Sequence, residues 1–492
     1  MSNEQVNYQM YIGGEWVSAE SERNLVSTNP YTGDDWATVP DAQVADVDKA
    51  VTAAREAFEH GEWSSMSAKD RGALLRKMGD LVGENAEHLG RMESLDNGKL
   101  YREMLAQTTY LQEWFYYFAG AADKLQGATI PSERPNFFIY TRPEPVGVVA
   151  AITPWNSPVL LLGFKLAPAL AAGCTFVVKP SEHTSVSTLE FAKLFDKAGF
   201  PKGVFNVITG GPDTGNALAN NHGVDKIAFT GSTKTGISVA KAAAEHVGRV
   251  SLELGGKSPN IVFADADLKA AANGVIAGIF GATGQTCMAG SRLLVHESVK
   301  DELVDLIATR AATIVMGDPM DPATEMGPMA TGQQFDKVLG MLKRAKEQGA
   351  TFVTGGGKSA AHDGYFIEPT IITDIDPEME IGKDEIFGPV LSVFTFDSEE
   401  DAIAKANDTR YGLAAGVWTL SGQRGHRVAH KLRAGTVWIN AYRVVSPNTP
   451  FGGFKESGLG RENGFDAMKQ YTENKSVWVE LDGATRDPFS IG

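Results

Sequence analysis

The sequence predicts an α/β protein built around a doubly wound parallel sheet. Between residues 146 and 254, short continuous apolar runs, typical of strands buried on both faces, alternate with helical patterns. Glycine-rich segments follow two of these strands, at turns where a ligand can approach the backbone closely. The alternation resumes after residue 255, and the length of 492 residues exceeds one ordinary core, so we expect a second α/β domain.

The first half of the chain contains the clearer strand and helix signals. The Gly13-Gly14 turn predicts a hairpin, and Ser67 can cap a helix. The aromatic residues of the third helix are typical of a core or a subunit interface. We expect a hairpin over 8–17, helices at about 42–59, 68–89, 100–122, 158–172, 185–198, after 215 and up to 246, and strands at 146–152, 175–178, 205–208, 226–229 and 250–254.

Within the first half, the segment 125–145 contains four prolines and is expected to project as strands and turns.

The second half repeats the pattern of strands and helices less regularly. The tail 476–481 alternates apolar and polar residues as an exposed strand does, has no evident partner in its own chain, and is expected to dock on another subunit. Further strands are expected at 259–263, 291–295, 351–353, 390–394, 416–419 and 436–439, and helices at about 266–282, 298–314, 332–348, 399–406 and 423–432.

Composition excludes several classes of function. The net charge of −16, without a cluster of Lys and Arg, argues against nucleic acid as a partner. Met1–Gln5 lacks the features of a secretory signal, and prolines and Lys165 interrupt the apolar stretch 146–172, so we expect no membrane span. The two cysteines do not suggest a disulfide framework, which predicts a reducing, cytoplasmic location. No histidine or cysteine spacing suggests a metal site.

One of the two cysteines stands in an unusual context. Cys287 lies between Gly284 and Gly290, so a ligand can approach its thiol closely, whereas Cys174 lies in an apolar run. Taken alone, either thiol is more often an inert core residue than a nucleophile. A hydrolase of the Cys–His type would need an oriented histidine, and the nearest, His296, lies beyond an apolar run.

Two glycine-rich loops and one charged pair are candidates for nucleotide binding. The loops 229–236 and 210–215 each follow a strand, where a helix N-terminus could hold a pyrophosphate, although neither matches a Gly-x-Gly-x-x-Gly or P-loop motif. Taken singly, each loop is more often an ordinary tight turn between a strand and a helix, but two such loops on successive strands of one sheet are a better signal than one. Lys179 and Glu182 end the second strand and could bind ribose hydroxyls, or they could be solvated charges.

Two polar residues beside apolar strands are candidates for catalysis. Asn156 follows the first strand, and its amide could donate to an oxyanion or satisfy a loop carbonyl. Glu253 lies in an apolar strand just before Gly255 and Gly256. If desolvated, its raised pKa would suit a general base, and otherwise it is an ordinary exposed residue. The spacing of these residues in the sequence does not decide between the catalytic and the ordinary role of either one.

Seven sequence blocks in one order resemble the NAD(P)-dependent aldehyde dehydrogenase superfamily. The resemblance runs from about residue 8 to residue 480. The blocks are Pro154-Trp155-Asn156, Lys179-Pro180-Ser181-Glu182, Phe229-Thr230-Gly231-Ser232, Leu252-Glu253-Leu254-Gly255-Gly256-Lys257, Gly284-Gln285-Thr286-Cys287, Glu385-Ile386-Phe387-Gly388-Pro389, and Pro450-Phe451-Gly452-Gly453 with Ser457-Gly458-Leu459-Gly460-Arg461-Glu462.

The resemblance implies three parts. A Rossmann-like NAD-binding domain would comprise residues 1–123 and 146–254, and an α/β catalytic domain residues 255–470. A small β oligomerisation flap would comprise residues 124–145 and 471–492. Members of the family are homodimers or homotetramers in which the C-terminal strand completes a neighbour's sheet, so this chain is expected to do the same.

The resemblance also implies a reaction. Cys287 would attack the aldehyde carbonyl, and the Asn156 amide and the Cys287 backbone N–H would stabilise the oxyanion. Hydride transfer to the nicotinamide would convert the thiohemiacetal to a thioester. Glu253 would then activate water to release the carboxylic acid. Lys165 and Glu462 match a pair that relays protons.

Cofactor residues follow from the matched motifs. Glu182 would repel a 2′-phosphate, so NAD is favoured, although some relatives with this motif also accept NADP. The residues implied to bind the cofactor are Ile152, Thr153, Pro154, Trp155, Lys179, Ser181, Glu182, Gly211, Gly215, Phe229, Thr230, Gly231, Ser232, Gly236, Leu254, Gly255, Glu385 and Phe387.

The resemblance says less about the small-molecule aldehyde. Ser157 stands where the family often has an aromatic residue, which would widen the pocket. Arg443 suggests an anionic or polar aldehyde such as a semialdehyde, or it points to solvent or pairs with an acidic neighbour. The implied lining residues are Tyr110, Ser157, Phe164, Thr286, Met288, Arg443, Val445 and Phe451.

Two other functions compete with hydrolytic oxidation. A CoA-acylating dehydrogenase would transfer the acyl group to CoA, but such enzymes lack the glutamate found here at Glu253. A binding protein that has kept the fold would have lost Cys287, Glu253 or Asn156, and all three are present.

Overall fold

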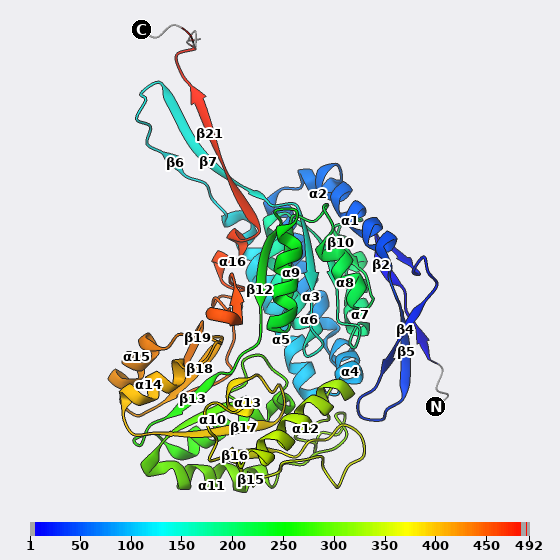
Figure 1. The fold of residues 1–492 in the computed structure, drawn as a ribbon. Helices are drawn as coiled ribbons and strands as arrows, with labels where there is room; N and C mark the ends of the chain where they lie inside the picture. Colours follow the sequence, from blue (N-terminus) through cyan, green and yellow to red (C-terminus); the bar gives the residue numbers. More distant parts are fainter. Residues whose placement is uncertain (1–4, 484–488, 490–492) are drawn as a thin grey trace.

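The computed structural model describes residues 5–483 and 489. Two α/β bodies lie one beside the other, and a thin β extension projects from the first (Figure 1). The predicted domain ends 1–4, 484–488 and 490–492 lie outside the described residues. No helix in the part that the structure describes is long and apolar enough to cross a membrane.

The first body contains the predicted doubly wound sheet. Its strands run in the order β20-β12-β11-β8-β9-β10-β2-β3, with β8 to β12 parallel and β2, β3 and β20 antiparallel to their neighbours. The strands are β2 (Met10–Ile12), β3 (Glu15–Val17), β8 (Val148–Ile152), β9 (Thr175–Lys179), β10 (Phe205–Val207), β11 (Lys226–Thr230), β12 (Arg249–Glu253) and β20 (Gly458–Leu459).

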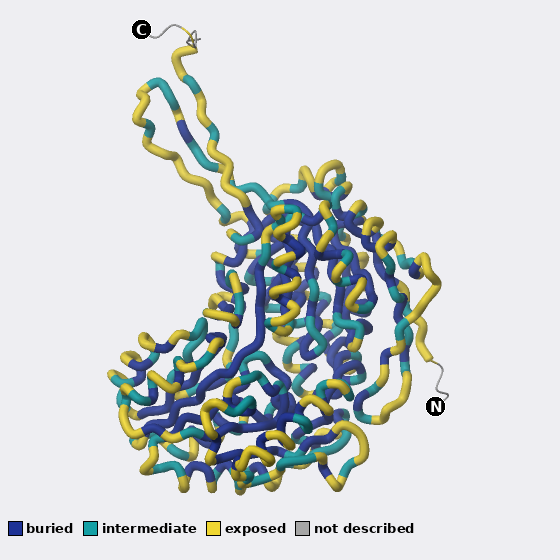
Figure 2. The backbone as a smooth tube through the Cα atoms, in the orientation of Figure 1, coloured by how far each residue is buried: buried dark blue, intermediate teal, exposed yellow. Residues whose placement is uncertain are grey.

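Helices cover both faces of this sheet. Because side chains alternate along a strand, Val149 and Ala151 of β8 face one core and Val148 and Ala150 face the other. Figure 2 shows the buried strands at the centre of this body. The first core contains α3 (Ala68–Glu84), α4 (Ala86–Asn97), α5 (Tyr101–Ala121), α6 (Pro158–Ala172) and α7 (Val186–Ala198), together with Trp63 of α2 (Glu62–Ser65) and Ala122 of the 3₁₀ turn Ala122–Lys124. The second contains α1 (Val44–Glu59), α8 (Pro212–Ala219) and α9 (Thr233–Ala244).

Two expectations for the N-terminal region were wrong. The helix expected over 68–89 divides at Asn85 into α3 and α4, because the N–H of Asn85 closes α3 and the residue leaves the helical region with φ −107° and ψ 11°. A small sheet of order β1-β5-β4 was also missed. Its strands, which carry few large apolar residues, are β1 (Val6–Asn7), β4 (Asn24–Thr28) and β5 (Asp35–Pro40).

The second body is the predicted second α/β unit. Its sheet has the order β15-β16-β17-β14-β13-β18-β19, and all neighbours are parallel except β15 and β16. The short strand β16 was missed. The elements are β13 (Pro259–Val262), β14 (Arg292–His296), β15 (Thr351–Thr354), β16 (Thr370–Thr373), β17 (Val390–Phe396), β18 (Ala414–Trp418), β19 (Thr436–Ile439), α10 (Leu268–Ile279), α11 (Lys300–Ala311), α12 (Gly332–Glu347), α13 (Glu380–Lys383), α14 (Glu399–Asn407) and α15 (Gly422–Lys431), with 3₁₀ turns at Gly281–Gly284, Glu297–Val299 and Lys455–Ser457.

The C-terminal strand has a partner in its own chain, contrary to the expectation from sequence. Strand β21 (Thr472–Glu480) pairs antiparallel with β7 (Phe137–Pro145) over its whole length, and β6 (Thr129–Ile130) pairs with the other side of β7. More than 300 residues separate the two long strands, so no local signal could show the pairing. The three-stranded sheet projects from the body and is largely exposed (Figures 1 and 2).

The chain returns to the first body before it enters this projection. Strand β20 pairs with β12, and α16 (Phe465–Lys469) places Ala467 and Met468 in the first core. We therefore propose that residues 458–470, which sequence analysis assigned to the catalytic domain, belong to the cofactor domain.

Two buried carboxylates fix the helices that lead away from the sheet. Glu93 accepts the N–H of Val159 at 2.9 Å, near the start of α6. Asp96 accepts the N–H groups of Val186 and Ser187 at 2.9 and 3.3 Å, at the start of α7. These carboxylates satisfy amides that a helix N-terminus leaves without partners. Because α6 begins two residues after Asn156, Glu93 helps to set the position of that side chain.

We predict that Asp96→Ala lowers the free energy of unfolding by about 3 kcal/mol, because two amides and a buried hydroxyl lose their acceptor. The hydroxyl is that of Ser27, 2.6 Å from Asp96. Urea unfolding measures the change. Asp96→Asn should cost less, since it keeps one acceptor, and Asp336→Ala on the exposed face of α12 should have little effect. Equal midpoints for the Asp96 and Asp336 alanine variants would contradict this role.

Candidate functional site

A cavity of about 700 Å³ opens at the carboxyl ends of the parallel strands. It lies where β8 is flanked by β9 on one side and β11 on the other, the point at which strand order reverses and ligands bind in such sheets. A second cavity of about 140 Å³ shares Pro154, Trp155 and Thr230 to Ser232 with it and reaches Cys287. Together they form one path from the sheet edge to the thiol.

Most of the predicted cofactor residues line this path. The large cavity contains Ile152 to Trp155, Lys179, Ser181, Glu182, Gly215 and Phe229 to Ser232, and the smaller one adds Leu254, Gly255, Glu385 and Phe387. Gly211 and Gly236 line neither cavity. Gly211 is the N-cap of α8, and a Cβ on Gly236 would lie 2.4 Å from Leu254, so this glycine serves the packing of α9.

The loop before α9 is shaped for close approach. The Ser232 hydroxyl caps α9 by accepting the N–H of Thr235 at 3.2 Å. A Cβ on Gly231 would lie 2.5 Å from the ring of Phe229, so a side chain there would displace the ring that lines the cavity. The free N–H groups and the positive end of a helix favour an anion such as a pyrophosphate.

The charged pair at the end of β9 faces the same cavity. The ammonium of Lys179 lies 3.3 Å from Glu182, and both side chains line the cavity. A lysine donor beside a carboxylate acceptor can bind the two hydroxyls of a ribose.

The opposite wall comes from the second body. Glu385 accepts the N–H of Gly256 at 3.0 Å, and burial raises the pKa of this carboxyl to about 7. Phe387 adopts a positive φ of 58° and packs edge-to-face on Trp155 with ring centroids 5.2 Å apart. Gln334 of α12 holds the bend through the carbonyls of Ile386 and Phe387 at 2.8 and 3.1 Å. The two bodies therefore meet across the cavity.

The segment before Cys287 is strained in a way that exposes the thiol to this path. Ala282, Thr283 and Gly284 have φ values of 55°, 56° and 68°, three successive left-handed residues. A Cβ on Gly284 would lie 2.1 Å from the carbonyl oxygen of Gly388, so only glycine fits there. The Asn156 amide donates to the carbonyl of Gln285 at 3.1 Å, which ties the asparagine to the cysteine loop.

Cys287 is protonated at neutral pH in this environment. Burial raises the pKa of its thiol to about 12, and the carboxylates of Glu253 and Glu385 add to the effect, while the Met288 backbone N–H and Lys99 oppose it. A thiol of this kind needs a nearby base to become a nucleophile. Cys174, by contrast, is fully buried in the first core and donates to the carbonyl of Tyr471 at 3.3 Å.

Glu253 is a carboxylate near this thiol. It lines the same cavity as Cys287, and its Oε2 is buried without a hydrogen-bond partner. Burial raises the pKa of Glu253 well above its ordinary value, and the Glu462 carboxylate raises it further, while Lys165 and Arg461 act in the opposite direction. The ammonium of Lys165 pairs with Glu462 and donates to Thr230 at 2.6 Å. Lys165 and Glu462 line neither cavity and lie behind Glu253.

The predicted substrate residues do not form one group. Tyr110, Phe164 and Phe451 form an aromatic group joined by Trp114, which is buried in the first core as the aromatic spacing of its helix predicts. Ser157 and Arg443 form part of a polar group beside the cysteine loop. Thr286 and Met288 flank Cys287, and Val445 packs at the edge of the first core.

Other lining residues were also missed. Gln334 and Lys337 of α12 line both cavities, and His183, Asn216 and Leu161 line one of them. The α12 residues occupy one face of an ordinary amphipathic helix, so no local motif distinguishes them.

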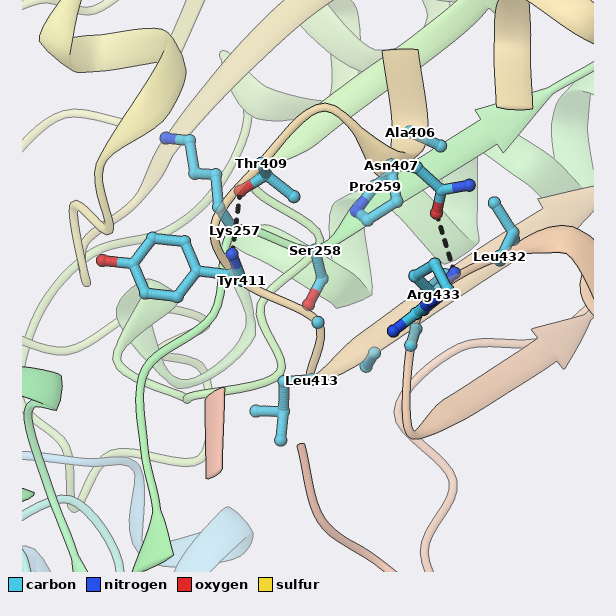
Figure 3. A pocket seen from close by; sticks show the side chains of 14 residues that line it. Lys257, Ser258, Pro259, Ala406, Asn407, Thr409, Tyr411, Leu413, Leu432 and Arg433 are labelled. Atoms are coloured by element: carbon cyan, nitrogen blue, oxygen red, sulfur yellow. Dashed lines mark hydrogen bonds between the residues drawn. The ribbon is translucent and has the colours of Figure 1, made fainter. Parts of the chain in front are cut away.

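One further cavity lies beside the site in the second body, between Lys257, Tyr411 and Arg433 (Figure 3). Its volume of about 10 Å³ suits at most one water molecule, so it is no candidate for a cofactor. Within the described ranges, no group of three or more His, Cys, Asp or Glu side chains could hold a metal ion.

Comparison with known proteins identifies the family. The sequence profile described as the aldehyde dehydrogenase family matches residues 16–477. The chain is 48% identical over 486 residues to a (Z)-2-((N-methylformamido)methylene)-5-hydroxybutyrolactone dehydrogenase of Acinetobacter baylyi, covering 98% of this chain and 99% of the relative. It is 45% identical over 477 residues to the aldehyde dehydrogenase, mitochondrial, of Mesocricetus auratus, covering 96% and 95%.

Solved structures agree. An aldehyde dehydrogenase from Bacillus cereus in complex with NAD⁺ superimposes with a TM-score of 0.95 at 47% identity, covering 98% of this chain and 97% of that one. A betaine aldehyde dehydrogenase from Staphylococcus aureus in complex with NAD⁺ gives a TM-score of 0.97 at 40% identity, covering 99% and 97%. The chain belongs to the aldehyde dehydrogenase family and is an NAD(P)-dependent oxidoreductase that oxidises aldehydes.

Proposed function

We propose that the protein oxidises its aldehyde to the carboxylic acid through a covalent thioester on Cys287. The observation that carries this proposal is the shared cavity, which brings together a thiol able to attack (Cys287), a carboxylate able to take a proton (Glu253) and an amide able to stabilise an oxyanion (Asn156). The Cys287 sulfur attacks the carbonyl carbon, and the thiol proton passes to Glu253, whose raised pKa makes it a competent base.

Asn156 and the cysteine loop supply the oxyanion site. The Asn156 side-chain NH₂ has two hydrogens, and the bond to the Gln285 carbonyl uses one of them. The other, with the Cys287 backbone N–H, is proposed to donate to the oxygen that becomes negative during attack. When bound, NAD(P) accepts the hydride whose loss converts the thiohemiacetal on Cys287 to a thioester.

Release of the acid requires a water molecule and a base. Glu253 is proposed to take a proton from water as the water attacks the thioester carbon, after which the Cys287 sulfur leaves. Lys165 and Glu462 lie behind Glu253 and are proposed to pass the proton onward to solvent. The alternative, acyl transfer to CoA, is disfavoured because it has no use for a buried carboxylate at this position.

The cavity fits a dinucleotide. Its volume of about 700 Å³ is within the range of cofactor sites, and the Ser232 cap and Gly231 leave the N-terminus of α9 open for a pyrophosphate. We propose that Lys179 and Glu182 bind the adenosine ribose and that Glu385 and Phe387 hold the nicotinamide end. The Glu182 carboxylate disfavours a 2′-phosphate, so NAD is the preferred cofactor.

Assembly and location are proposals as well. The outer edge of β21 pairs with no other strand in the described part of the chain, and an open edge is a template for a further strand. We propose that this edge joins a second copy of the chain in a homodimer or homotetramer. We propose a cytoplasmic location, because both cysteines are free thiols.

The two catalytic roles predict different kinetic defects. Cys287→Ser should lower NADH formation about 100-fold or more, because a serine hydroxyl is a far weaker nucleophile. Glu253→Gln should lower both the first turnover and the steady rate about 100-fold at pH 7, because the thiol proton and the attacking water both lose their base. Raising the pH should restore the first turnover before the steady rate, as a burst of about one NADH per active site, because more of the thiol is then ionised while thioester hydrolysis still lacks its base. Stopped-flow absorbance records NADH formation in the first turnover and in the steady state, and so separates the two defects.

Glu245→Gln, on an exposed residue after α9, is the matched control and should keep the wild-type rate. Full steady-state activity of Cys287→Ser would contradict the covalent route. Formation of acyl-CoA instead of acid when CoA is present would support the acyl-transfer alternative.

The raised pKa of Cys287 predicts how the thiol reacts with alkylating reagents. In the protein without cofactor, iodoacetamide should label Cys287 with a rate that rises about tenfold per pH unit between pH 7 and 9, since only the thiolate reacts. Mass spectrometry locates the label, and Cys174 should remain unmodified because it is fully buried. A rate independent of pH above 7 would show that the thiol has a lowered pKa.

Cofactor preference should depend on Glu182. Glu182→Gln should raise kcat/KM for NADP about tenfold, because it removes a repulsive charge and leaves Lys179 free to contact the 2′-phosphate. The value for NAD should fall, since the ribose loses a charged acceptor. Glu87→Gln, exposed on α4, should leave the NAD to NADP ratio unchanged. An unchanged ratio in Glu182→Gln would contradict this assignment.

A further inference from the structure

A group of polar side chains lies on α5 and near the segment that leads to Cys287. The group consists of Lys99, Glu103, Gln107, Ser157 and Arg443, called here the polar cluster. None of its members lines either of the two cavities proposed for the cofactor. The proposed reaction gives none of them a role, so this much polarity beside a reacting thiol requires another explanation.

The two cations of the polar cluster occupy space left by small residues. The Lys99 ammonium is buried and donates to the Ser157 hydroxyl at 3.2 Å, where a larger side chain would exclude it. Arg443, at a positive φ of 63°, donates to the carbonyl of Ala277 at 2.8 Å. A Cβ on Gly281 would lie 2.4 Å from the Arg443 guanidinium. Each cation keeps N–H donors beyond the bonds described.

The α5 side of the polar cluster contributes acceptors without partners. Glu103 accepts the N–H of Ala282 through Oε1 at 3.1 Å, so it contacts the strained segment that leads to Cys287. Its Oε2 is buried and has no hydrogen-bond partner, and neither has the buried Oε1 of Gln107. Residues four apart lie on one face of a helix, so both acceptors face the same side of α5.

The same face of α5 leads on to the aromatic group. Tyr110 and Trp114 continue the spacing of Glu103 and Gln107, and Trp114 stacks on Phe164 with centroids 4.7 Å apart. The polar cluster is therefore one end of a stripe whose other end consists of aromatic side chains proposed to contact the substrate.

The formal charges of Lys99 and Arg443 are balanced only when Glu93, which lies beside the polar cluster, is counted together with Glu103 of the cluster. Burial lowers the pKa of Lys99 to about 8, and the charges around this lysine include the Arg443 cation and the carboxylates of Glu93 and Glu103. Two cations thus face two carboxylates, with no net formal charge. An added substrate carboxylate would lose its hydration and gain no surplus cation in return. Glu103 Oε2 and Gln107 Oε1 are buried without partners, which costs about 1–3 kcal/mol for each atom, and an alkyl tail has no donor to relieve that cost, whereas an amide has.

Building on the proposed function, we infer that the polar cluster selects aldehydes whose tail is polar and uncharged and carries both hydrogen-bond donors and acceptors, as a primary amide does. The amide N–H groups donate to Gln107 and Glu103, and the amide oxygen accepts from Arg443 or Lys99. Gln107 and Arg443 are the specificity-determining residues, since neither takes part in the reaction itself. Sites that hydrogen-bond a substrate group discriminate strongly against analogues that lack it.

Three aldehydes of matched shape test the inference with NAD as cofactor: 6-oxohexanamide, 6-oxohexanoate and 6-methylheptanal. They share a five-carbon aldehyde chain and differ only in a terminal amide, carboxylate or isopropyl group. The wild-type kcat/KM should be at least about tenfold higher for the amide than for either of the others, as expected for one matched hydrogen bond or more. Equal values, or a preference for the carboxylate or the alkyl aldehyde, would overturn the inference.

Two variants assign the preference to the polar cluster. Gln107→Leu keeps the shape and removes the acceptor, and Arg443→Met removes the donors. Each should lower the ratio of kcat/KM for the amide to that for the alkyl aldehyde about tenfold. Arg102→Met is the matched control, because Arg102 lies on the same helix but contacts the carbonyl of Pro322 at 3.2 Å, and it should keep the wild-type ratio.

A merely structural role would lower all three rates together, so the ratio separates selectivity from folding, and thermal unfolding identifies any variant that is misfolded. If Arg443→Met does not fold, the three aldehydes with the wild-type protein and with Gln107→Leu decide whether the polar cluster selects the substrate. Wild-type ratios in both variants would show that other residues select the substrate. If the proposed function were wrong, Cys287→Ser would oxidise all three aldehydes, which is a different outcome from failure of the selectivity.

Discussion

The site depends on the burial of Glu253 at the end of β12, beside a single ammonium that Glu462 already pairs. Desolvation and the Glu462 carboxylate raise the pKa of Glu253, and the cations of Lys165, which Glu462 pairs, and of Arg461 offset this only in part. The same burial raises the pKa of the Cys287 thiol. If water reached Glu253 and Cys287, the pKa values of both groups would lie close to their ordinary values. The chemistry is therefore a consequence of where the second body closes over the sheet edge.

The scaffold brings these groups together by a geometric rule and by specific capping contacts. Parallel strands place their carboxyl ends at one edge, so the segments after β8, β9, β11 and β12 meet there regardless of their separation in sequence. Glu93 and Asp96 then anchor the first turns of α6 and α7. Burying carboxylates is costly, and they are retained where they satisfy helix amides that would otherwise be orphaned.

The proposed substrate side differs in chemistry from the proposed cofactor side. Along the proposed cofactor path, glycines and the N-terminus of α9 leave backbone N–H groups open, and such groups bind any phosphate. In the polar cluster, cations lie near acceptors that lack partners. Small residues at 157 and 281 make room for cations rather than for a wider apolar pocket, which changes the meaning of the departure at Ser157.

The sequence by itself determined the alternation of strands and helices, the Gly231–Ser232 turn, and Cys287, Asn156 and Glu253 as candidates, because periodicity, turn chemistry and motifs are local. It missed β16 and the division of the helix at Asn85, where propensity is weak and tertiary contacts decide. Only the tertiary structure decided that β21 pairs with β7, that Lys165 meets Glu462, and that Arg443 stands over Gly281. These contacts join segments far apart in the chain, and burial and charge depend on what the rest of the fold brings alongside.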